Sequence, residues 1–540
     1  MRNFSFFILS MCMATVAVGQ QLRVNETRFI IGDSTCGNGI YYTITTKDRG
    51  LLMVGNTDCN NVGDIIAPIN DSALSLNVLI CKMDSNMHVS WVKVYGGTQV
   101  DNAISVCATS DGGYAVLAGT ASSNGDVPAL NGAGSGTAWL IKTDANGNKL
   151  WSTVFGCHGS MSAMSVAEAP DHGFVVLSSV NGSGIDVPFI YVNTAFLQDW
   201  VLIKTDSSGN KQWSRTIGGT GDEGPYGSVL AVSNGYYIAS TSTSTDHDCS
   251  DTTWHAGVNT HTDVYLIKTD TAGNVVWDSS YGGSNYESVF SAMFDIRDSS
   301  IEIVGSTLSS DYMVHDHQGY AGDENCWVIK TDKNGKLLWE TTLIDTNVGG
   351  GLNQAKVITP APNGGYAVLG NIVNGNIGSE DVRLFITDSQ ANVISNKMVG
   401  GTDYEMAYGI EGYKNGYALI GTTQSHVFSE GININQSPST FNSFVSYVEY
   451  WPEALQNVRE ETRQLLCYPN PGQNKIRVKL AGGNLNGDIS IVNNAGRKVF
   501  AQKTTAAYLD IETRKWARGG YIVAYRSTDG EAISCKITIE

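Results

Sequence analysis

Four carboxylates stand at one fixed distance from four Gly-Gly pairs. The pairs are residues 96–97, 218–219, 282–283 and 400–401, and the fourth residue after each pair is Asp101, Glu223, Glu287 or Glu405. If the strands that follow were innermost in a repeated fold, these groups would crowd around one opening, where close like charges raise each other's pKa or attract a cation. In the alternative interpretation, each carboxylate accepts hydrogen bonds from backbone N–H groups of its own glycine turn.

Histidines form the second candidate site. Five of the nine fall within residues 247–317, among several aspartates, and they are His247, His255, His261, His315 and His317. Imidazole and carboxylate groups are ligands of zinc and related metals, so two neighbouring loops could bring a divalent metal site together. The competing interpretation is that His255 and His317, each two residues before a glycine, belong to the repeat itself. No other cofactor is predicted, and the sequence has no nucleophile elbow, Walker loop or HExxH motif.

A repeat of about 60 residues carries these positions. Residues 140–151 (Leu-Ile-Lys-Thr-Asp-Ala-Asn-Gly-Asn-Lys-Leu-Trp) return at 202–213, 266–277 and 328–339, with a weaker copy at 80–91. Aspartate opens a turn and glycine supplies a positive φ, so each copy predicts a β-hairpin. A second strand, typified by residues 113–120, occurs seven times. We therefore expect seven repeats of four short strands.

Two features of the repeat predict contacts between neighbouring sheets. A tryptophan follows the turn aspartate by seven residues in five copies, and its large apolar area suits packing between sheets: Trp91, Trp151, Trp213, Trp277 and Trp339. Residues 29–32 precede the first repeat in the place of the tryptophan strand. We expect this N-terminal strand to complete the last sheet beside residues 443–449, which hides two sheet edges.

The predicted fold is all-β, with a seven-bladed β-propeller over residues 27–450. The spacing of aspartate, glycine and tryptophan resembles the blades of quinoprotein-type propellers and, more closely, the repeat propellers of bacterial secreted surface proteins, over about residues 28–450. The resemblance implies an architecture only. Quinoproteins have a vicinal cysteine pair that this sequence lacks, so quinone binding has no support.

The last residues form a separate segment. After a polar linker at 451–464, alternating runs predict a small β-sandwich over 465–540, in which Cys467 and Cys535 could pair. This segment resembles the type A C-terminal sorting domain of the type IX secretion system in its Tyr-Pro-Asn-Pro motif, its Gly-Gly-Tyr motif and its terminal strand: Tyr468, Pro469, Asn470, Pro471, Gly520, Tyr521 and Lys536. The resemblance implies that the secretion machinery carries the chain across the outer membrane of a Gram-negative cell, to the surface or the medium.

The start of the chain agrees with export. Residues 1–19 have the basic start, apolar run and small-residue end of a signal peptide, and no later apolar run is long enough to cross a bilayer.

Residues 460–540 carry 12 Lys+Arg and 8 Asp+Glu, which leaves 22 against 44, a net charge of −22, for residues 1–459. Such an excess of anions repels phosphate, so nucleic acid is excluded as a partner.

Two functions remain open after the sequence is read. The first is a monomeric, noncatalytic binding or scaffold module that is secreted or displayed on the cell surface and recognises glycans or extracellular proteins. The alternative is a secreted polysaccharide hydrolase or lyase that uses carboxylates at the channel mouth as acid and base.

Overall fold

The computed structural model describes most of the chain, and it divides the chain into two compact units, Met1–Tyr450 and Trp451–Glu540. The described residues are 21–30, 38–59, 65, 75–129, 134, 136–192, 197–251, 261–315, 317, 323–343, 353–372, 380–401, 403–425, 427–428, 432–433, 442–451, 465–468, 474–480, 485–493, 497–527 and 532–539. These residues form strands and no helix, which confirms the all-β prediction. The predicted signal peptide and linker residues 452–464 lie outside the described residues, as do His255, Pro469, Asn470 and Pro471.

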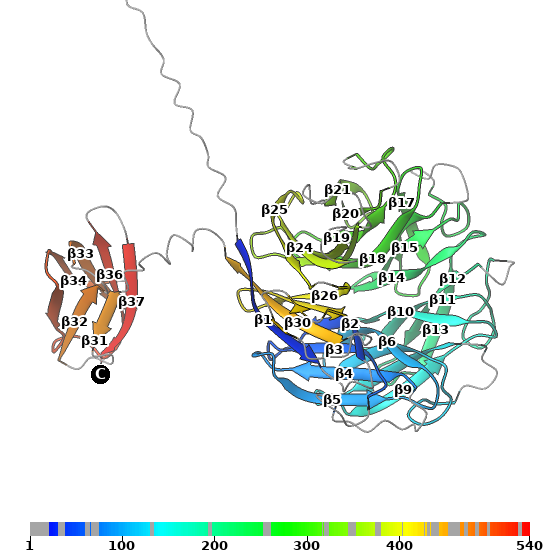
Figure 1. Ribbon diagram of the computed structural model, residues 1–540, viewed down its shortest axis with the longest axis horizontal. Coiled ribbons are helices and arrows are strands. Elements are labelled where there is room, and N and C mark those ends of the chain that lie inside the picture. Colours follow the sequence, from blue (N-terminus) through cyan, green and yellow to red (C-terminus); the bar gives the residue numbers. More distant parts are fainter. Residues whose placement is uncertain are drawn as a thin grey trace, which may run out of the picture. The chain divides into compact units, whose positions relative to one another are not determined.

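Seven four-stranded sheets make up most of the described part of the first unit, and we number them in chain order (Figure 1). Sheet 1 holds β2 (Asn38–Thr45), β3 (Leu51–Thr57), β4 (Asn77–Met83) and β5 (Val89–Tyr95). Sheet 2 holds β6 (Asp101–Ala108), β7 (Tyr114–Thr120), β8 (Thr137–Thr143) and β9 (Lys149–Phe155). Sheet 3 holds β10 (Met161–Glu168), β11 (Phe174–Val180), β12 (Asp199–Thr205) and β13 (Lys211–Ile217).

The remaining four sheets repeat this order of strands. Sheet 4 holds β14 (Glu223–Val232), β15 (Gly235–Ser242), β16 (Asp263–Thr269) and β17 (Val275–Tyr281), and sheet 5 holds β18 (Glu287–Asp295), β19 (Ser300–Thr307), β20 (Asn325–Thr331) and β21 (Leu337–Leu343). Sheet 6 holds β22 (Asn353–Pro360), β23 (Tyr366–Ile372), β24 (Asp381–Thr387) and β25 (Val393–Val399). Sheet 7 holds β26 (Glu405–Tyr413), β27 (Gly416–Thr423), β30 (Asn442–Trp451) and β1 (Gln21–Ile30), and its long loop carries the two-residue strands β28 (Val427–Phe428) and β29 (Ile432–Asn433).

The repeated hairpin forms as its sequence predicts. In sheet 2, Asp144 Oδ1 accepts hydrogen bonds of 2.8 Å from the backbone N–H groups of Asn146 and Asn148, and Gly147 takes a φ of +75°. Strands β8 and β9 therefore pair directly across this turn. Every residue of β8 is buried, because neighbouring sheets cover both of its faces.

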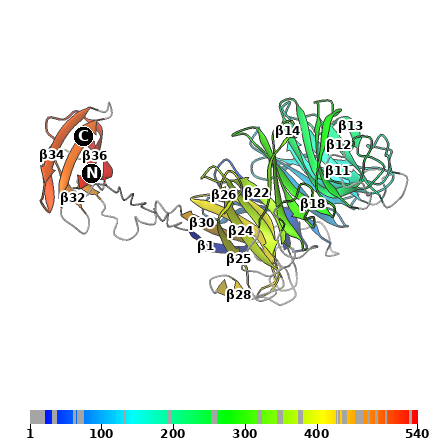
Figure 2. The ribbon, with the colours of Figure 1, turned by 90° about the horizontal axis from the view of Figure 1, so that it is seen from above.

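The sheets contact one another in chain order. The first strand of each sheet contacts the first strand of the next, from β2 and β6 to β22 and β26, and Figure 2 shows β22 beside β26. Strand β26 also contacts β2, so sheet 7 lies beside sheet 1. Across this contact the Thr45 hydroxyl donates a hydrogen bond of 2.7 Å to Glu411, and Tyr413 Oη donates one of 2.6 Å to the Ser85 carbonyl.

The N-terminal strand completes sheet 7, as the sequence predicts. Strand β1 pairs with β30 and lies beside it in Figure 1, so the two ends of the first unit share one sheet. The hydroxyls of Thr27 and Ser446 are 2.8 Å apart across these strands. The strand begins earlier than the expected residues 29–32, and at its start Leu22 and the buried Val24 alternate with the exposed Arg23 and Asn25.

The tryptophans pack between sheets, which confirms their predicted role. An atom placed as Cβ on Gly147, Gly209, Gly273 or Gly335 would lie 2.5–2.7 Å from the ring of Trp91, Trp151, Trp213 or Trp277 in the preceding sheet. Each ring therefore lies directly on the hairpin turn of the next sheet. Glycine is required at these turns for its positive φ and also for the space that the ring occupies.

The second unit holds two sheets around one apolar core. One has three strands, β31 (Leu465–Tyr468), β32 (Lys475–Leu480) and β35 (Tyr508–Glu512). The other has four, β34 (Lys498–Thr504), β33 (Gly487–Asn493), β36 (Gly519–Ser527) and β37 (Ala532–Ile539). Inward-facing residues such as Ile476, Ile491 and Val523 form the shared core.

The packing of tryptophan on glycine predicts the effect of two matched substitutions. Gly209→Ala places a methyl group 2.5 Å from Trp151, whereas Gly112→Ala, at a similar φ of +92°, meets no atom within 4 Å. Both variants carry the strain of a left-handed alanine, about 1–2 kcal/mol, and only Gly209→Ala adds overpacking, about 1–3 kcal/mol. Thermal melts should show the larger loss of Tm for Gly209→Ala, and equal losses would contradict this account of the turn.

Candidate functional site

The four carboxylates that follow the Gly-Gly pairs are buried at the starts of first strands. Asp101 begins β6, Glu223 begins β14, Glu287 begins β18 and Glu405 begins β26, and each is at most 1% exposed. Gly97 N–H and Gly401 N–H donate hydrogen bonds of 2.7 Å to Asp101 and Glu405, and Gly283 N–H donates one of 3.4 Å to Glu287. These contacts are the backbone hydrogen bonds of the alternative interpretation.

Hydroxyl groups complete the surroundings of each carboxylate. A Ser or Thr at the end of the second strand and another two residues later donate to the same group, as Thr423 and Ser425 do to Glu405 at 2.6 and 2.5 Å. Ser242 and Ser244 donate to Glu223 at 2.9 and 2.5 Å in the same way. The carboxylate thus joins three segments of its own sheet.

Each carboxylate also meets a polar residue of the preceding sheet. These partners begin the third strands β4, β12, β16 and β24, and they are Asn77, Asp199, Asp263 and Asp381. In all four cases the backbone N–H of the carboxylate residue donates to the carbonyl just before its partner, as the Glu405 N–H does to the Glu380 carbonyl at 2.9 Å. Three of the four partners are acids, so a pair of buried carboxyl groups joins sheets 3 and 4, sheets 4 and 5, and sheets 6 and 7.

Burial and mutual repulsion keep these pairs from ionising fully. Burial, with the neighbouring Glu405 carboxylate, raises the pKa of Asp381 to about 6. Burial likewise raises the pKa of Glu223 beside Asp199, and of Asp263 beside Glu287. Two carboxyl groups in contact are stable when they share one proton, because one then donates a hydrogen bond to the other.

These contacts between sheets also explain the first glycine of each Gly-Gly pair. A Cβ on Gly218 would lie 2.6 Å from Asp199 Oδ1 and 2.8 Å from Glu223 Oε2, and one on Gly400 would lie 2.5 Å from Asp381 Oδ1. The oxygens of the pair therefore occupy the space of a side chain. Any larger residue would push the two sheets apart at this point.

Sequence reasoning found one member of each pair and missed the other. The missed residues were recognisable, because each stands seven residues before a turn aspartate and 24 residues before its partner: Asn77, Asp199, Asp263 and Asp381. This regular offset is a signal that the sequence contains. Its meaning depends on which strands of neighbouring sheets meet, and the sequence does not state that directly.

The described histidines contact separate neighbours. The ring of His247 stacks on Tyr191 with centroids 4.4 Å apart, and that of His261 packs edge-on against Tyr286. His315 Nδ1 lies 3.0 Å from Glu340 Oε1. His317 Nε2 lies 2.8 Å from the Asp323 carbonyl. With His255 outside the described residues, the metal site stays a prediction.

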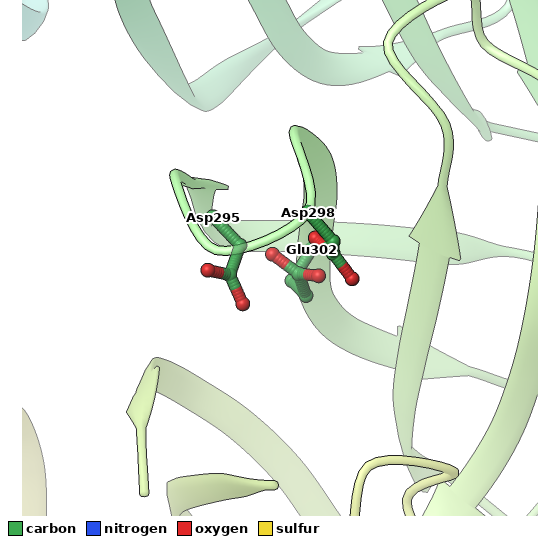
Figure 3. Close-up of side chains that lie close together, drawn as sticks. All are labelled: Asp295, Asp298 and Glu302. Carbon is green, nitrogen blue, oxygen red and sulfur yellow. The ribbon is translucent and has the colours of Figure 1, made fainter. Parts of the chain in front are cut away.

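One group of three acids has the spacing of metal ligands among the described residues. Asp295, Asp298 and Glu302 lie in and beside the turn from β18 to β19, with ligand atoms within 4.8 Å of one another (Figure 3). Arg297 contacts Asp295 at 2.6 Å, and Lys330 contacts Asp298 at 2.6 Å and Glu302 at 3.3 Å. Two cations of the chain therefore already contact all three acids, and we interpret this group as structural.

A cavity of about 610 Å³ lies among the first strands of all seven sheets. Its lining includes Tyr41 of β2, Ser162 of β10, Tyr226 of β14 and Tyr408 of β26. Among the lining residues the only charged side chain is Lys356 of β22, and none is a carboxylate. The volume falls within the range of about 300–1,000 Å³ that is usual for ligand pockets.

The cavity is lined by one repeated position. The third residue after the start of each first strand lies at a β-bulge or a longer irregularity, where the register to the second strand shifts. A bulge residue has no direct partner and can turn its side chain away from the sheet. All seven such residues line the cavity, and we call them the bulge ring: Tyr41, Ile104, Met164, Tyr226, Phe290, Lys356 and Tyr408.

In the second unit, the described residues of the sorting motif serve the local fold. Tyr521 is buried, and its hydroxyl donates a hydrogen bond of 2.6 Å to the Ala517 carbonyl. Gly520 is half-buried beside it, Lys536 is exposed on β37, and Tyr468 ends β31. A disulfide joins Cys467 and Cys535, the two cysteines that the sequence suggested could pair.

Comparison with known families identifies this second unit. Residues 466–540 match the family described as the secretion system C-terminal sorting domain. The match bears out the resemblance of the sequence to a type IX sorting domain, and it indicates export to the cell surface or the extracellular space. Among the described residues, no helix has the length and apolar character that crossing a bilayer requires. No curated protein matches the chain.

Solved structures give only distant likenesses. A protein of unknown function from Dyadobacter fermentans is 9% identical, with a TM-score of 0.34 over 70% of this chain and 98% of its own. A member of the DUF4221 family from Bacteroides vulgatus is 8% identical, with a TM-score of 0.38 over 80% and 98%. PorZ, a surface component of the type IX secretion system of Porphyromonas gingivalis, is 9% identical, with a TM-score of 0.14 over 95% and 100%. Scores this low support no functional assignment.

The carboxyl pairs predict a pH dependence of stability, which one substitution should reduce and another should introduce between two other sheets. Folding favours protonated Asp381, whose pKa is raised to about 6. The contribution of protonated Asp381 to the free energy of unfolding is therefore complete below the ordinary aspartate pKa of about 4. This contribution is lost as the pH rises through about 6. Asp381→Asn keeps a neutral donor at every pH, so its Tm should change less between pH 4 and pH 7 than that of the wild type.

The matched variant reverses this change in sheets 1 and 2. Asn77 occupies the corresponding place beside Asp101, and Asn77→Asp would create a fourth carboxyl pair. Its Tm should fall below that of the wild type as the pH rises above about 4. Tm curves of the two variants that run parallel to the wild-type curve would show that the pairs share no proton.

Proposed function

We propose that the first unit is a closed seven-bladed β-propeller that binds a ligand in its central cavity without catalysis. We further propose that the small β-sandwich that follows it in the sequence directs export. The contact of β26 with β2 and the pairing of β1 with β30 support the closure. The matched sorting domain supports a secreted or surface location, reached through the type IX secretion machinery. A rigid ring that presents side chains to one cavity is a suitable platform for recognition.

The bulge ring is the observation that carries this proposal. Seven structurally equivalent positions line one cavity, and four of them hold the aromatic residues Tyr41, Tyr226, Phe290 and Tyr408. Tyr226 is 64% exposed, so it offers a large amphipathic surface to a ligand rather than to the core. Glycans suit such a lining, because sugar rings present C–H faces to aromatic rings and hydroxyls to serine and asparagine.

The placement of the carboxylates favours binding over hydrolysis. A glycosidase needs two carboxyl groups on opposite sides of the bond that it breaks, about 5–10 Å apart. Asp101, Glu223, Glu287 and Glu405 are buried in their own turns, and no carboxylate is among the cavity-lining residues. We therefore do not propose the alternative of a polysaccharide hydrolase or lyase.

Filling the cavity tests the proposed function. The exposed Ser162 lines the cavity, and Ser162→Tyr would occupy it without disturbing a core side chain. On a glycan array this variant should lose at least 90% of the wild-type signal. The control Ser207→Tyr, in an exposed turn outside the cavity, should keep it. Equal binding by both variants, or sugar products detected by mass spectrometry, would overturn the proposal.

The sorting domain gives a second, independent test. A chain that stops after Trp451 should accumulate in the periplasm of the producing cell, because the machinery no longer recognises it. Residues 465–540 fused to an unrelated periplasmic reporter should carry that reporter out of the cell. Cell fractionation measures both, and normal export of the shortened chain would rule out the proposed role of the second unit.

A further inference from the structure

Lys356 departs from the other members of the bulge ring. Six of the seven positions hold a neutral side chain, and five of those six are Tyr, Phe or Met. Lys356 is therefore the one position at which the repeat places a full charge in the cavity. Repeat proteins build a scaffold from what their repeats share, so a residue that breaks the pattern at the cavity calls for a local explanation.

The ammonium group of Lys356 is held in place by neutral neighbours. It donates a hydrogen bond to Gln354 Oε1, and its Nζ lies 3.5 Å from the centroid of the Phe290 ring. A cation over an aromatic face is attracted by the ring, and both Lys356 and Phe290 line the cavity. Lys356 is half-buried, which leaves part of it within reach of a ligand.

No carboxylate among the described residues forms an ion pair with Lys356. Glu324, from the preceding sheet, accepts hydrogen bonds from Gln354 Nε2 at 3.1 Å and from the Ser306 hydroxyl. Glu324 and Glu380 favour the charged amine from a distance, yet burial outweighs them and lowers the pKa of Lys356 to about 8. A half-buried cation without a direct counter-ion gains from an anion that enters the cavity.

The other lining residues limit which chemical groups the anion can carry besides its negative charge. Tyr41, Tyr226 and Tyr408 offer aromatic faces, and Ser162, Ser291 and Asn102 offer small polar groups. A purely apolar acid would leave those polar groups without partners, and inorganic phosphate would leave the aromatic faces uncovered. A ring with a C–H face, several hydroxyls and one carboxylate satisfies all three kinds of lining.

Resting on the proposed binding function, we propose that the central cavity binds an acidic sugar, a uronic acid residue of a polysaccharide, with its carboxylate on Lys356 Nζ and its ring against the tyrosines of the bulge ring. A cavity of about 610 Å³ has room for two such residues. Charge-assisted hydrogen bonds are stronger than neutral ones, so the carboxylate contributes much of the affinity and sets the choice of sugar.

Isothermal titration of the secreted full-length chain tests this proposal with matched ligands. Digalacturonate, dimannuronate and diguluronate are titrated beside their methyl esters, which keep the shape and lose the charge. At least one acid should bind with a Kd at least tenfold lower than its ester. Equal binding of acid and ester, or no binding of any acid at millimolar concentration, would overturn the proposal.

Variants of Lys356 identify the group responsible. Lys356→Met installs the residue that sheet 3 carries at the same position, Met164, and it should weaken binding of the acid at least tenfold while leaving the ester unchanged. Lys356→Arg keeps the cation and should retain most of the affinity. Lys336→Met removes an exposed lysine from the turn between β20 and β21 and should have no effect. Unchanged binding of the acid by Lys356→Met would overturn the assignment.

The outcomes separate this inference from the proposed function. Neutral sugars that bind, and that Ser162→Tyr blocks, would refute the acidic sugar and leave the cavity as a binding site. Acids that bind equally well to Ser162→Tyr would place the ligand elsewhere on the chain and refute both. A Tm of Lys356→Met within about 3 °C of the wild type confirms that a loss of binding is not a loss of folding.

Discussion

Burial of both faces of each four-stranded sheet is the constraint on which the first unit depends. All seven residues of β4, β8, β12, β16, β20 and β24 are buried. Because such a sheet exposes apolar surface unless a neighbour covers each face, a linear stack would leave its two end sheets incomplete. The contact of β26 with β2 supplies the missing neighbours. The tryptophan and glycine contacts and the carboxyl pairs then fix the spacing between sheets.

Each first strand places a residue that contacts the preceding sheet close to a residue that lines the cavity. The residue that begins the strand is tied to the preceding sheet, as Glu405 is beside Asp381. Three residues later, a bulge turns a side chain into the cavity. A bulge residue contributes little to the hydrogen-bond ladder, so its identity can change without loss of the fold. This arrangement lets Tyr408 and Lys356 occupy equivalent places in otherwise similar sheets.

Much of the fold could be predicted because local chemistry determines it. The turn at Asp144 and Gly147, the tryptophans and the N-terminal strand each leave a regular mark in the sequence, and the structure agrees with each. The sorting domain was recognisable because its motifs are specific. In each case the residues that interact are close in the sequence or recur at a fixed period.

The candidate site was harder to predict because it depends on contacts between sheets. Asp381 belongs to a third strand and Glu405 to the next first strand, and only the packing of sheets 6 and 7 brings them together. The bulge ring was missed because a bulge appears as a register shift between strands and not as a residue type. Lys356 therefore has no special appearance in the sequence, and its role emerges from the seven equivalent positions.

A crystal structure of the secreted chain in complex with the uronic acid disaccharide that binds best would test the central claim most directly. The account predicts seven sheets in a closed ring and electron density for the sugar in the central cavity, with its carboxylate at Lys356 and its ring against Tyr41, Tyr226 or Tyr408. Sugar density on the outer loops, or a chain in which β26 and β2 lie apart, would contradict it.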